Sequence, residues 1–247
     1  SQALDQDPAI KAVLMVHNET STGVTNPLAR LCEVVRGFDK LLVVDGISSL
    51  GSLEFQVDDW GIDVAITASQ KGWMAPPGLA MLSFSPRAWE AHAAATMPRF
   101  YWDVEMARRS LEKGQTPFTP AVSTFYAMLA SLELMAEEGQ QRIIDRHRQV
   151  ADTVRRGVKG LGLSLLPPEE SASNTVSAIR VPEGVEAKQL LGLLAQQGIV
   201  LSGGQGQMEG RIFRIGHLGW VTVEDVQVVL SALEAALPQA GFVGAAR

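Results

Sequence analysis

Short apolar runs that alternate with helical stretches constrain the fold of this chain more than any other feature. The runs cover residues 10–16, 41–44, 64–68 and 79–84. A helix is predicted between the first two of them, with Pro27 close to its start. Strands that are apolar on both faces and separated by helices are typical of a largely parallel sheet. The first part of the chain is therefore predicted to have an α/β fold.

The pattern changes near Thr119. Beyond it, the predicted elements are helices over 120–138, 142–161 and 187–197, strands over 176–181, 199–202 and 212–216, and a final helix that Thr222 caps with Asp225 nearby. This order predicts a smaller α+β domain. We place the boundary near residue 140, within a long helix, so that residues 1–140 belong to the large domain and residues 141–247 form the small one.

Composition excludes several classes of protein. With 247 residues and a net charge of −6, the chain lacks the basic surplus that neutralises nucleic-acid phosphates. Cys32 is the only cysteine, so an internal disulfide or a cysteine metal cluster is not expected, and we expect no metal. No apolar run approaches the roughly 18 residues of a transmembrane helix, and the first residues do not resemble a signal peptide. These features predict a cytoplasmic globular protein with no nucleic-acid or membrane partner.

Polar side chains follow three of the predicted strands. They occupy residues 17–23, Asp45 and residues 69–71. In an open α/β sheet, ligands bind beyond the carboxyl ends of the strands. All three polar clusters are expected at that edge, so they predict one shared site.

Asp45 and Lys71 together suit one kind of chemistry. A lysine can hold pyridoxal 5′-phosphate as an imine, while an aspartate keeps the pyridine nitrogen protonated. Taken alone, Asp45 would be a turn or helix-cap residue and Lys71 a solvated charge. Their pairing at one sheet edge favours the cofactor, and Lys71 would then also act as the general base.

Four further side chains are candidates for contact with this cofactor. Thr20 would donate a hydrogen bond to a ring substituent, and Ile47 would pack on one face of the ring. Ser69 and Gln70 would help to hold the phosphate. His17 is interpreted as a hydrogen-bonded loop or core histidine in preference to a catalytic one.

The segments at residues 17–23, 44–51 and 69–72 read HNETSTG, VDGISSLG and SQKG. Together they resemble the class V aminotransferases, and among them the alanine–glyoxylate and serine–glyoxylate (serine–pyruvate) group of fold-type I pyridoxal-phosphate enzymes. The resemblance continues in order over essentially the whole chain, at residues 75–78, 116–122 and 213–219. It implies a large domain with a mostly parallel sheet, incomplete at its N-terminal side, and a smaller α+β C-terminal domain.

The resemblance also implies roles for individual residues. Lys71 corresponds to the lysine that forms the Schiff base, and Asp45 corresponds to the aspartate on the pyridine nitrogen. Thr20 matches a ring-contacting hydroxyl residue, and Gln70 matches a phosphate ligand. Arg214 matches the arginine that binds the substrate α-carboxylate, a task suited to a planar bidentate donor.

The partners implied by the resemblance are a second copy and a companion segment. Thr116 and Thr119 lie in a stretch that resembles one reaching into the neighbouring subunit's site to touch its cofactor phosphate, so a homodimer is expected. Members of the family have a longer N-terminal part that supplies a phosphate loop and a ring stacker. We therefore expect a companion N-terminal chain or segment. Residues 203–206 are rich in glycine but are interpreted as a mobile loop on the substrate side.

The sequence thus predicts a pyridoxal-phosphate-dependent transaminase that moves an amino group from alanine or serine to glyoxylate or pyruvate. Two alternatives stay open. One is another enzyme of the same fold, such as a lyase or a cysteine desulfurase. A desulfurase would need a reactive cysteine on a mobile loop, whereas Cys32 lies in a predicted helix. A non-catalytic binding or assembly subunit could keep the fold without the activity.

Overall fold

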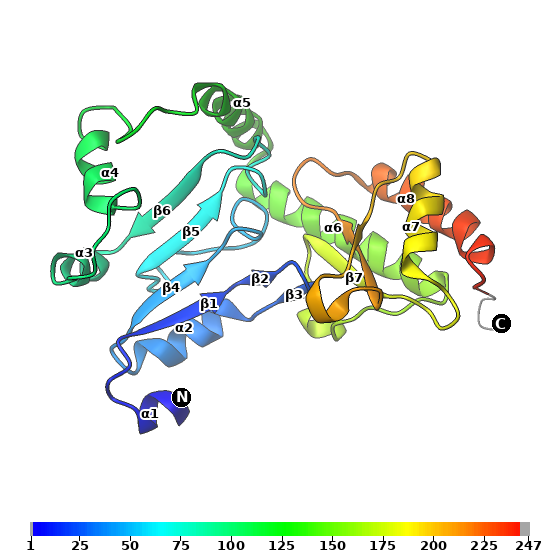
Figure 1. Ribbon diagram of the computed structural model, residues 1–247, viewed down its shortest axis with the longest axis horizontal. Helices are drawn as coiled ribbons and strands as arrows, with labels where there is room; N and C mark the ends of the chain where they lie inside the picture. Colours follow the sequence, from blue (N-terminus) through cyan, green and yellow to red (C-terminus); the bar gives the residue numbers. More distant parts are fainter. Residues whose placement is uncertain (1, 243–247) are drawn as a thin grey trace.

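The computed structural model describes residues 2–242 (Figure 1). Its first part is built around a four-stranded sheet in the order β1–β4–β5–β6. The strands are β1 (Ala12–Val16), β4 (Leu41–Asp45), β5 (Val64–Ala68) and β6 (Ala80–Phe84). The first three are parallel, and β6 is antiparallel to β5. The mostly parallel sheet that the sequence predicts is confirmed.

One face of this sheet is covered by helix α2 (Leu28–Arg36). Leu42 and Val44 alternate with less buried neighbours along β4, as expected where one face of a strand is covered. They pack in one buried cluster with Leu28 and Val35 of the helix. Burying each such side chain contributes about 1.5–3 kcal/mol, so this layer stabilises the packing of α2 on the sheet.

The opposite face of the sheet is largely uncovered. Residues directly opposite one another on neighbouring strands point to the same face, and two such rows run across the sheet: Leu14, Val43, Val64 and Phe84, then Val16, Asp45, Ile66 and Leu82. We call these two rows the open sheet face. Leu14 is 77% exposed and Leu82 51% exposed. Parallel sheets are normally covered on both faces, so this face is one that further polypeptide would bury.

Three helices follow β6, and the sequence predicted only the last of them. They are α3 (Pro86–Ala93), α4 (Val104–Leu111) and α5 (Val122–Glu138). The side chain of Ser85 caps α3 and that of Asp103 caps α4. Figure 1 places α3 and α4 beside β6. Each is only eight residues long, shorter than the window over which a helical period is read in a sequence.

The predicted long helix across residue 140 is wrong. Helix α5 ends at Glu138, and α6 (Gln140–Gly160) begins after Gly139, which adopts φ 84° and ψ 140°. Glycine reaches positive φ without the steric penalty that other residues meet, so the chain turns here instead of continuing as one helix. We propose that the boundary between the two domains lies at this glycine.

The second part of the chain packs three helices against an antiparallel sheet in the order β7–β9–β8. Its elements after α6 are β7 (Val176–Arg180), α7 (Ala187–Gln196), β8 (Ser202–Gly203), β9 (Ile212–Gly216) and α8 (Val223–Gln239). The strand predicted over 199–202 is wrong in extent: Ile199 and Leu201 pack against the hydrophobic core of this part, and of the predicted residues only Ser202 joins the sheet. Thr222 caps α8 in a capping box with Asp225, as predicted.

A short hairpin of β2 (Asn18–Glu19) and β3 (Val24–Thr25) joins the two parts. It leaves the carboxyl end of β1 and reaches toward β7 in Figure 1. There the Ser173 N–H donates to Gly23 O at 2.8 Å. The hairpin therefore carries backbone from the first part into contact with the second.

Helix α1 (Gln2–Gln6) precedes the sheet and contributes no buried residue. Within residues 2–242, no helix is both long and apolar enough to cross a bilayer.

Candidate active site

Lys71 lies in the connection between β5 and β6. Backbone hydrogen bonds close this connection: the Met74 N–H donates to Lys71 O at 2.9 Å, and the Ala75 N–H donates to Ser69 O at 3.0 Å. Met74 adopts φ 56°, a left-handed conformation that is uncommon outside glycine. Lys71 is therefore held in a closed turn beyond the carboxyl end of β5.

The structure gives Ser69 a task other than the phosphate binding predicted for it. Its side chain is fully buried, and its hydroxyl donates to Pro76 O at 2.7 Å while accepting from the Leu79 N–H at 3.2 Å. A serine hydroxyl has only one proton to donate, and here it is used within the turn. Ser69 therefore shapes the turn and is not supported as a phosphate ligand. Gln70 is exposed, which leaves its amide available to a ligand.

The lysine turn packs directly on the loop that follows Asp45. A Cβ atom on Gly72 would overlap Leu50 O and Ser52 Oγ. On the other side of the contact, Gly51 adopts φ 84° and lies against the Gly72 carbonyl. This backbone contact fixes the Lys71 turn relative to the Asp45 loop, which only a glycine at position 72 permits.

Asp45 is the last residue of β4 and belongs to the second row of the open sheet face. One carboxylate oxygen accepts the Ile47 N–H at 2.8 Å, and the backbone oxygen accepts the His17 N–H at 3.0 Å. The second carboxylate oxygen has no hydrogen-bond partner within residues 2–242. It remains available to a cationic or N–H group of a ligand beside the half-buried Ile47.

A cavity of about 180 Å³ brings Lys71, Thr20 and Arg214 together. Hydroxyl groups of Ser48, Thr175 and Ser202 are among its other lining side chains. The predicted ring and phosphate contacts do not line it, namely Asp45, Ile47 and Gln70. The structure therefore unites the predicted lysine and the predicted substrate arginine in one cavity, with the remaining cofactor candidates outside it.

Arg214 lies in β9 and is only 8% exposed. Its Nε donates to Gly203 O at 3.0 Å, and its Nη1 donates to Thr20 O at 3.1 Å. No carboxylate pairs with it in the described part of the chain, and its Nη2 has no hydrogen-bond partner there. A buried guanidinium is costly without an anion, so this arginine is poised to bind one from outside the chain. The glycine-rich stretch at 203–206 begins with the carbonyl that orients it.

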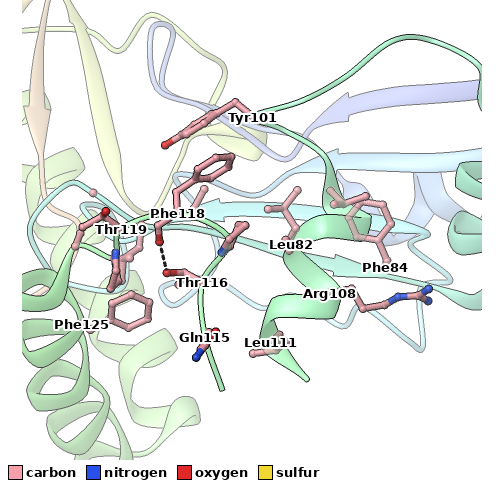
Figure 2. Close-up of a pocket in the computed structure, with 18 of the residues that line it drawn as sticks. Leu82, Phe84, Tyr101, Arg108, Leu111, Gln115, Thr116, Phe118, Thr119 and Phe125 are labelled. Atoms are coloured by element: carbon pink, nitrogen blue, oxygen red, sulfur yellow. Dashed lines mark hydrogen bonds between the residues drawn. The ribbon is translucent and has the colours of Figure 1, made fainter. Parts of the chain in front are cut away.

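Thr116 and Thr119 lie away from this cavity, in a separate groove of about 500 Å³ (Figure 2). The Thr116 hydroxyl donates to Phe118 O at 2.6 Å, which shapes the segment between α4 and α5. Figure 2 shows Phe118 and Tyr101 on one side of this groove, and their rings stack with centroids 4.7 Å apart. Within one copy of the chain, the two threonines are not joined to Lys71.

His17 packs as a core residue. It is buried, with its ring edge-on to Phe55 at 5.4 Å and to Trp60 at 6.2 Å between centroids. Burial lowers its pKa to about 4, so the ring is neutral near pH 7. Its Nδ1 is buried without a hydrogen-bond partner within residues 2–242. This packing agrees with the interpretation of His17 as a core histidine.

Cys32 is buried in α2, within the cluster that packs under the sheet. Burial raises the pKa of its thiol, which disfavours the nucleophilic thiolate. The position argues against a cysteine desulfurase, since that chemistry needs an accessible and reactive cysteine.

Sequence reasoning missed the hydroxyl lining of the cavity and the side chain that organises it. Ser48 stands three residues after Asp45, and Thr175 comes directly before the strand predicted at 176–181. Ser48 follows the rule that ligands bind beyond the carboxyl ends of the strands in an α/β sheet, and that rule could have found it. Thr175 precedes a strand of the antiparallel sheet, so its position carries no such signal. Asn18 lies in the 17–23 cluster, and the sequence assigned it no role.

A family model described as aminotransferase class-V matches residues 2–225. The chain belongs to the class-V aminotransferase family. The resemblance inferred from the motifs is thereby confirmed. Members of this family depend on pyridoxal phosphate.

Individual proteins are similar to most of this chain. The small subunit of a soluble hydrogenase from a Synechococcus species is 44% identical over 94% of this chain and 61% of its own length. The L-aspartate–glyoxylate aminotransferase of Paracoccus denitrificans is 42% identical over 88% of this chain and 56% of its own. The crystal structure of an alanine–glyoxylate aminotransferase from a Nostoc species is 31% identical, covers 96% of this chain and 64% of its own, and has a TM-score of 0.89. The fold-type I architecture is confirmed, and the chain spans about three fifths of its relatives' length.

The side chains present fit the cofactor of this family. Lys71 has no hydrogen-bond or ion-pair partner within residues 2–242, and Asp45 keeps one carboxylate oxygen free. Thr20 lines the same cavity as the lysine. An amine, an acceptor for the ring nitrogen and a hydroxyl are the groups that a pyridoxal ring requires. For the phosphate, the exposed Gln70 lies next to Lys71 in the chain.

Proposed function

We propose that this chain is the catalytic portion of a pyridoxal-phosphate-dependent aminotransferase. The observation that carries this proposal is the cavity shared by Lys71 and a buried Arg214 that has no ion-pair partner in the described chain. A reactive amine beside an anion site fits a substrate that carries both an amino group and a carboxylate. Membership of the family implies the cofactor, and the residues of the cavity would bind the substrate and transfer its proton.

Pyridoxal phosphate, when bound, supplies an electron sink for the pair released at the substrate α-carbon. Lys71 would hold it and move the proton to and from that carbon. Asp45 would accept a hydrogen bond from the ring nitrogen and keep it protonated. Thr20 would donate to a ring substituent, and Ile47 would pack against the ring.

Arg214 would bind the α-carboxylate through its free Nη2 and orient the α-hydrogen toward Lys71. The cavity between them has a volume of about 180 Å³. A space of this size suits a small side chain. We therefore propose alanine or serine as the amino donor and glyoxylate or pyruvate as the acceptor.

Two partners and a location complete this proposal. A companion N-terminal chain or segment would bury the open sheet face and complete the cofactor cradle, because the free oxygen of Asp45 belongs to that face. A second copy would form a homodimer in which Thr116 and Thr119 approach the neighbouring cofactor phosphate, together with Gln70 of the other site. The buried, unpaired Cys32 is consistent with a cytoplasmic location.

The decisive test is covalent attachment of the cofactor to Lys71 in the full-length protein. We expect borohydride treatment to fix a pyridoxyl group on the peptide that contains Lys71, as read by mass spectrometry. Lys71→Ala should lose this adduct, the visible absorbance band and turnover of alanine with glyoxylate. Lys11→Ala is the matched control, because Lys11 directly precedes β1 at the edge of the sheet away from the site. This variant should retain the adduct, the absorbance band and turnover. Turnover by Lys71→Ala at the wild-type rate would refute the assignment.

A non-catalytic assembly subunit is the second candidate, favoured by the 44% identity to a protein named as a hydrogenase subunit. The same measurement separates the two functions. An assembly subunit would show no adduct on Lys71, and substitution of Lys71 would leave its association with partner proteins unchanged.

A further inference from the structure

Asn18 lies at the centre of a buried hydrogen-bond network next to the cavity. Its side chain is buried, and its Nδ2 donates to Ser48 Oγ at 3.1 Å and to Thr175 Oγ1 at 3.0 Å. Its Oδ1 accepts from Thr25 Oγ1 and from Ser173 Oγ, both at 2.6 Å. A carboxamide has two protons to donate and two lone pairs to accept, so the whole capacity of Asn18 is used.

The partners of Asn18 come from three separate parts of the chain. Thr25 belongs to the β2–β3 hairpin, Ser48 to the loop after Asp45, and Ser173 and Thr175 to the segment before β7. Ser48 and Thr175 also line the cavity of Lys71. One side chain therefore joins the two domains at the wall of the candidate active site.

Further hydrogen bonds connect the Asn18 network to the strand that carries Arg214. Thr175 O accepts the His217 N–H at 2.9 Å, which ties the start of β7 to the end of β9. Arg214 lies opposite Ala178 in the same strand pair and donates to Thr20 O in the hairpin. A Cβ atom on Gly23 would approach Ala178 N to 2.9 Å, so the hairpin and β7 are in close backbone contact. The strand that carries the arginine is thus attached to the hairpin at several points.

We propose that Asn18 is a positioning residue for substrate carboxylate binding, because its amide holds the β7–β9 strand pair, and with it Arg214, at a fixed offset from Lys71. The carboxylate site is then assembled before the substrate arrives, and the two domains do not separate at this joint. This inference rests on the proposed aminotransferase function, in which Arg214 binds the carboxylate.

The hydroxyl groups around Asn18 make an aspartate a poor substitute. Ser48 Oγ already donates to Asn18 O at 2.7 Å, and Thr175 Oγ1 already donates to Ser48 O at 3.1 Å. A carboxylate oxygen in place of Nδ2 would therefore face two acceptor oxygens and no donor. Asn18→Asp should push the two domains apart locally, at nearly constant side-chain volume.

The test uses the full-length holoenzyme and steady-state kinetics with the amino donor and the oxo-acid acceptor. We expect Asn18→Asp to raise KM for both carboxylate substrates about tenfold with kcat changed by less than about twofold. Pyridoxal phosphate occupancy should stay unchanged. Hydrogen–deuterium exchange should rise in residues 173–178 and 212–216. Asp63→Asn is the matched control: Asp63 is a buried side chain with two hydrogen bonds at the amino end of β5, and its substitution should leave KM unchanged.

A coupling measurement separates this role from a merely structural one. In an Arg214→Lys background, Asn18→Asp should add little to KM, because the group it positions is already altered. A full tenfold effect in that background would overturn the inference. If Asn18→Asp does not fold, Thr25→Val removes only one donor to Asn18 Oδ1 and should raise KM about threefold. Unchanged KM in Thr25→Val would also count against the inference.

The proposed function and this inference fail in different ways. If Arg214→Lys alone leaves KM unchanged, the carboxylate role of the arginine is wrong. If Arg214→Lys raises KM but the Asn18 and Thr25 variants do not, the aminotransferase proposal stands and only the positioning role of Asn18 is wrong.

Discussion

At the scale of single residues, the contact between Gly72 and the 50–52 loop decides where Lys71 lies. We expect Gly72→Ala to reduce both stability and cofactor attachment, because a methyl group would overlap the backbone oxygen of Leu50 and the hydroxyl of Ser52. The backbone cannot yield as a flexible side chain would, so a loss of about 1–3 kcal/mol is expected. Urea unfolding and the absorbance of the bound cofactor measure the two effects.

Gly192 provides the matched control for this substitution. It lies in α7, and a Cβ atom there would meet nothing within 4 Å. Gly192→Ala should stabilise the protein by about 0.5–1 kcal/mol through helix propensity and leave cofactor attachment unchanged. If Gly72→Ala and Gly192→Ala had the same stability and the same cofactor absorbance, the Gly72 contact would not constrain the lysine.

Resemblance of short motifs predicted the residues that the cavity unites, Lys71, Thr20 and Arg214. It could not predict what Ser69 does, because the hydroxyl that looks free in the sequence is bound to Pro76 O within the turn. The role of Asn18 was also beyond sequence reasoning, since its partner Thr175 is 157 positions away. Hydrogen bonds between distant segments leave no periodic signal in a single sequence.

At the scale of elements, the start of α6 clamps the loop that follows β9. Arg146 binds Glu138 through Nε at 2.6 Å and Nη2 at 2.9 Å, and its Nη1 donates to Gly219 O at 2.6 Å. The neighbouring His147 accepts the Gly219 N–H at 3.0 Å. A Cβ atom on Gly219 would lie 3.2 Å from Met74, in the lysine turn. The clamp therefore connects α6 to the turn that carries Lys71.

We expect Arg146→Lys to destabilise the protein by about 1–3 kcal/mol, because an ammonium group cannot reproduce the fork that spans Glu138 and Gly219. Hydrogen bonding to Arg146 also holds the pKa of Glu138 below its usual value, and that shift should shrink in the variant. Arg148→Lys is the control, because Arg148 is largely exposed and its pair with Asp145 is long at 3.5 Å. It should change stability by less than about 1 kcal/mol in the same urea titration. A comparable loss in both variants would contradict the clamp.

Elements with strong periodicity were predicted closely, and those that depend on one backbone angle were not. The strands at 64–68 and 212–216 were placed correctly by their apolar runs. The helices predicted over 120–138 and 142–161 lie close to α5 and α6, but the expectation that one long helix carries the domain boundary fails at the positive φ of Gly139. The short helix α4 turns Val104, Ala107 and Leu111 toward the groove, but its eight residues are too few to show a helical period in the sequence.

At the scale of the whole molecule, buried histidines set the response to acid. Burial lowers the pKa of His17 to about 4 and that of His217 to about 3, and it also lowers the pKa of His147. These groups have a pKa of about 6.5 when unfolded, so the unfolded chain binds more protons below that pH. The stabilising effect of the neutral rings is complete above about pH 6.5 and is lost as pH falls toward the folded pKa values.

We therefore expect the free energy of unfolding to fall between about pH 6.5 and pH 4, with a slope of up to about 1.4 kcal/mol per pH unit for each buried histidine. Urea titrations across this range measure the slope. His17→Phe should make it shallower, because one proton fewer is taken up on unfolding. A slope unchanged by this substitution would show that His17 does not remain neutral in the folded protein.

The antiparallel pairing of β5 with β6 has a mechanical consequence for the lysine. The segment at residues 69–79 connects β5 to β6, and these two strands form five residue pairs, from Val64 opposite Phe84 to Ala68 opposite Ala80. Moving its backbone would require this ladder to slip, and a slip would turn every side chain to the wrong face. The position of the Lys71 amine is therefore set by rotation about the bonds of its own side chain. A group bound to this amine can rotate with the side chain, while the backbone of Lys71 stays in place.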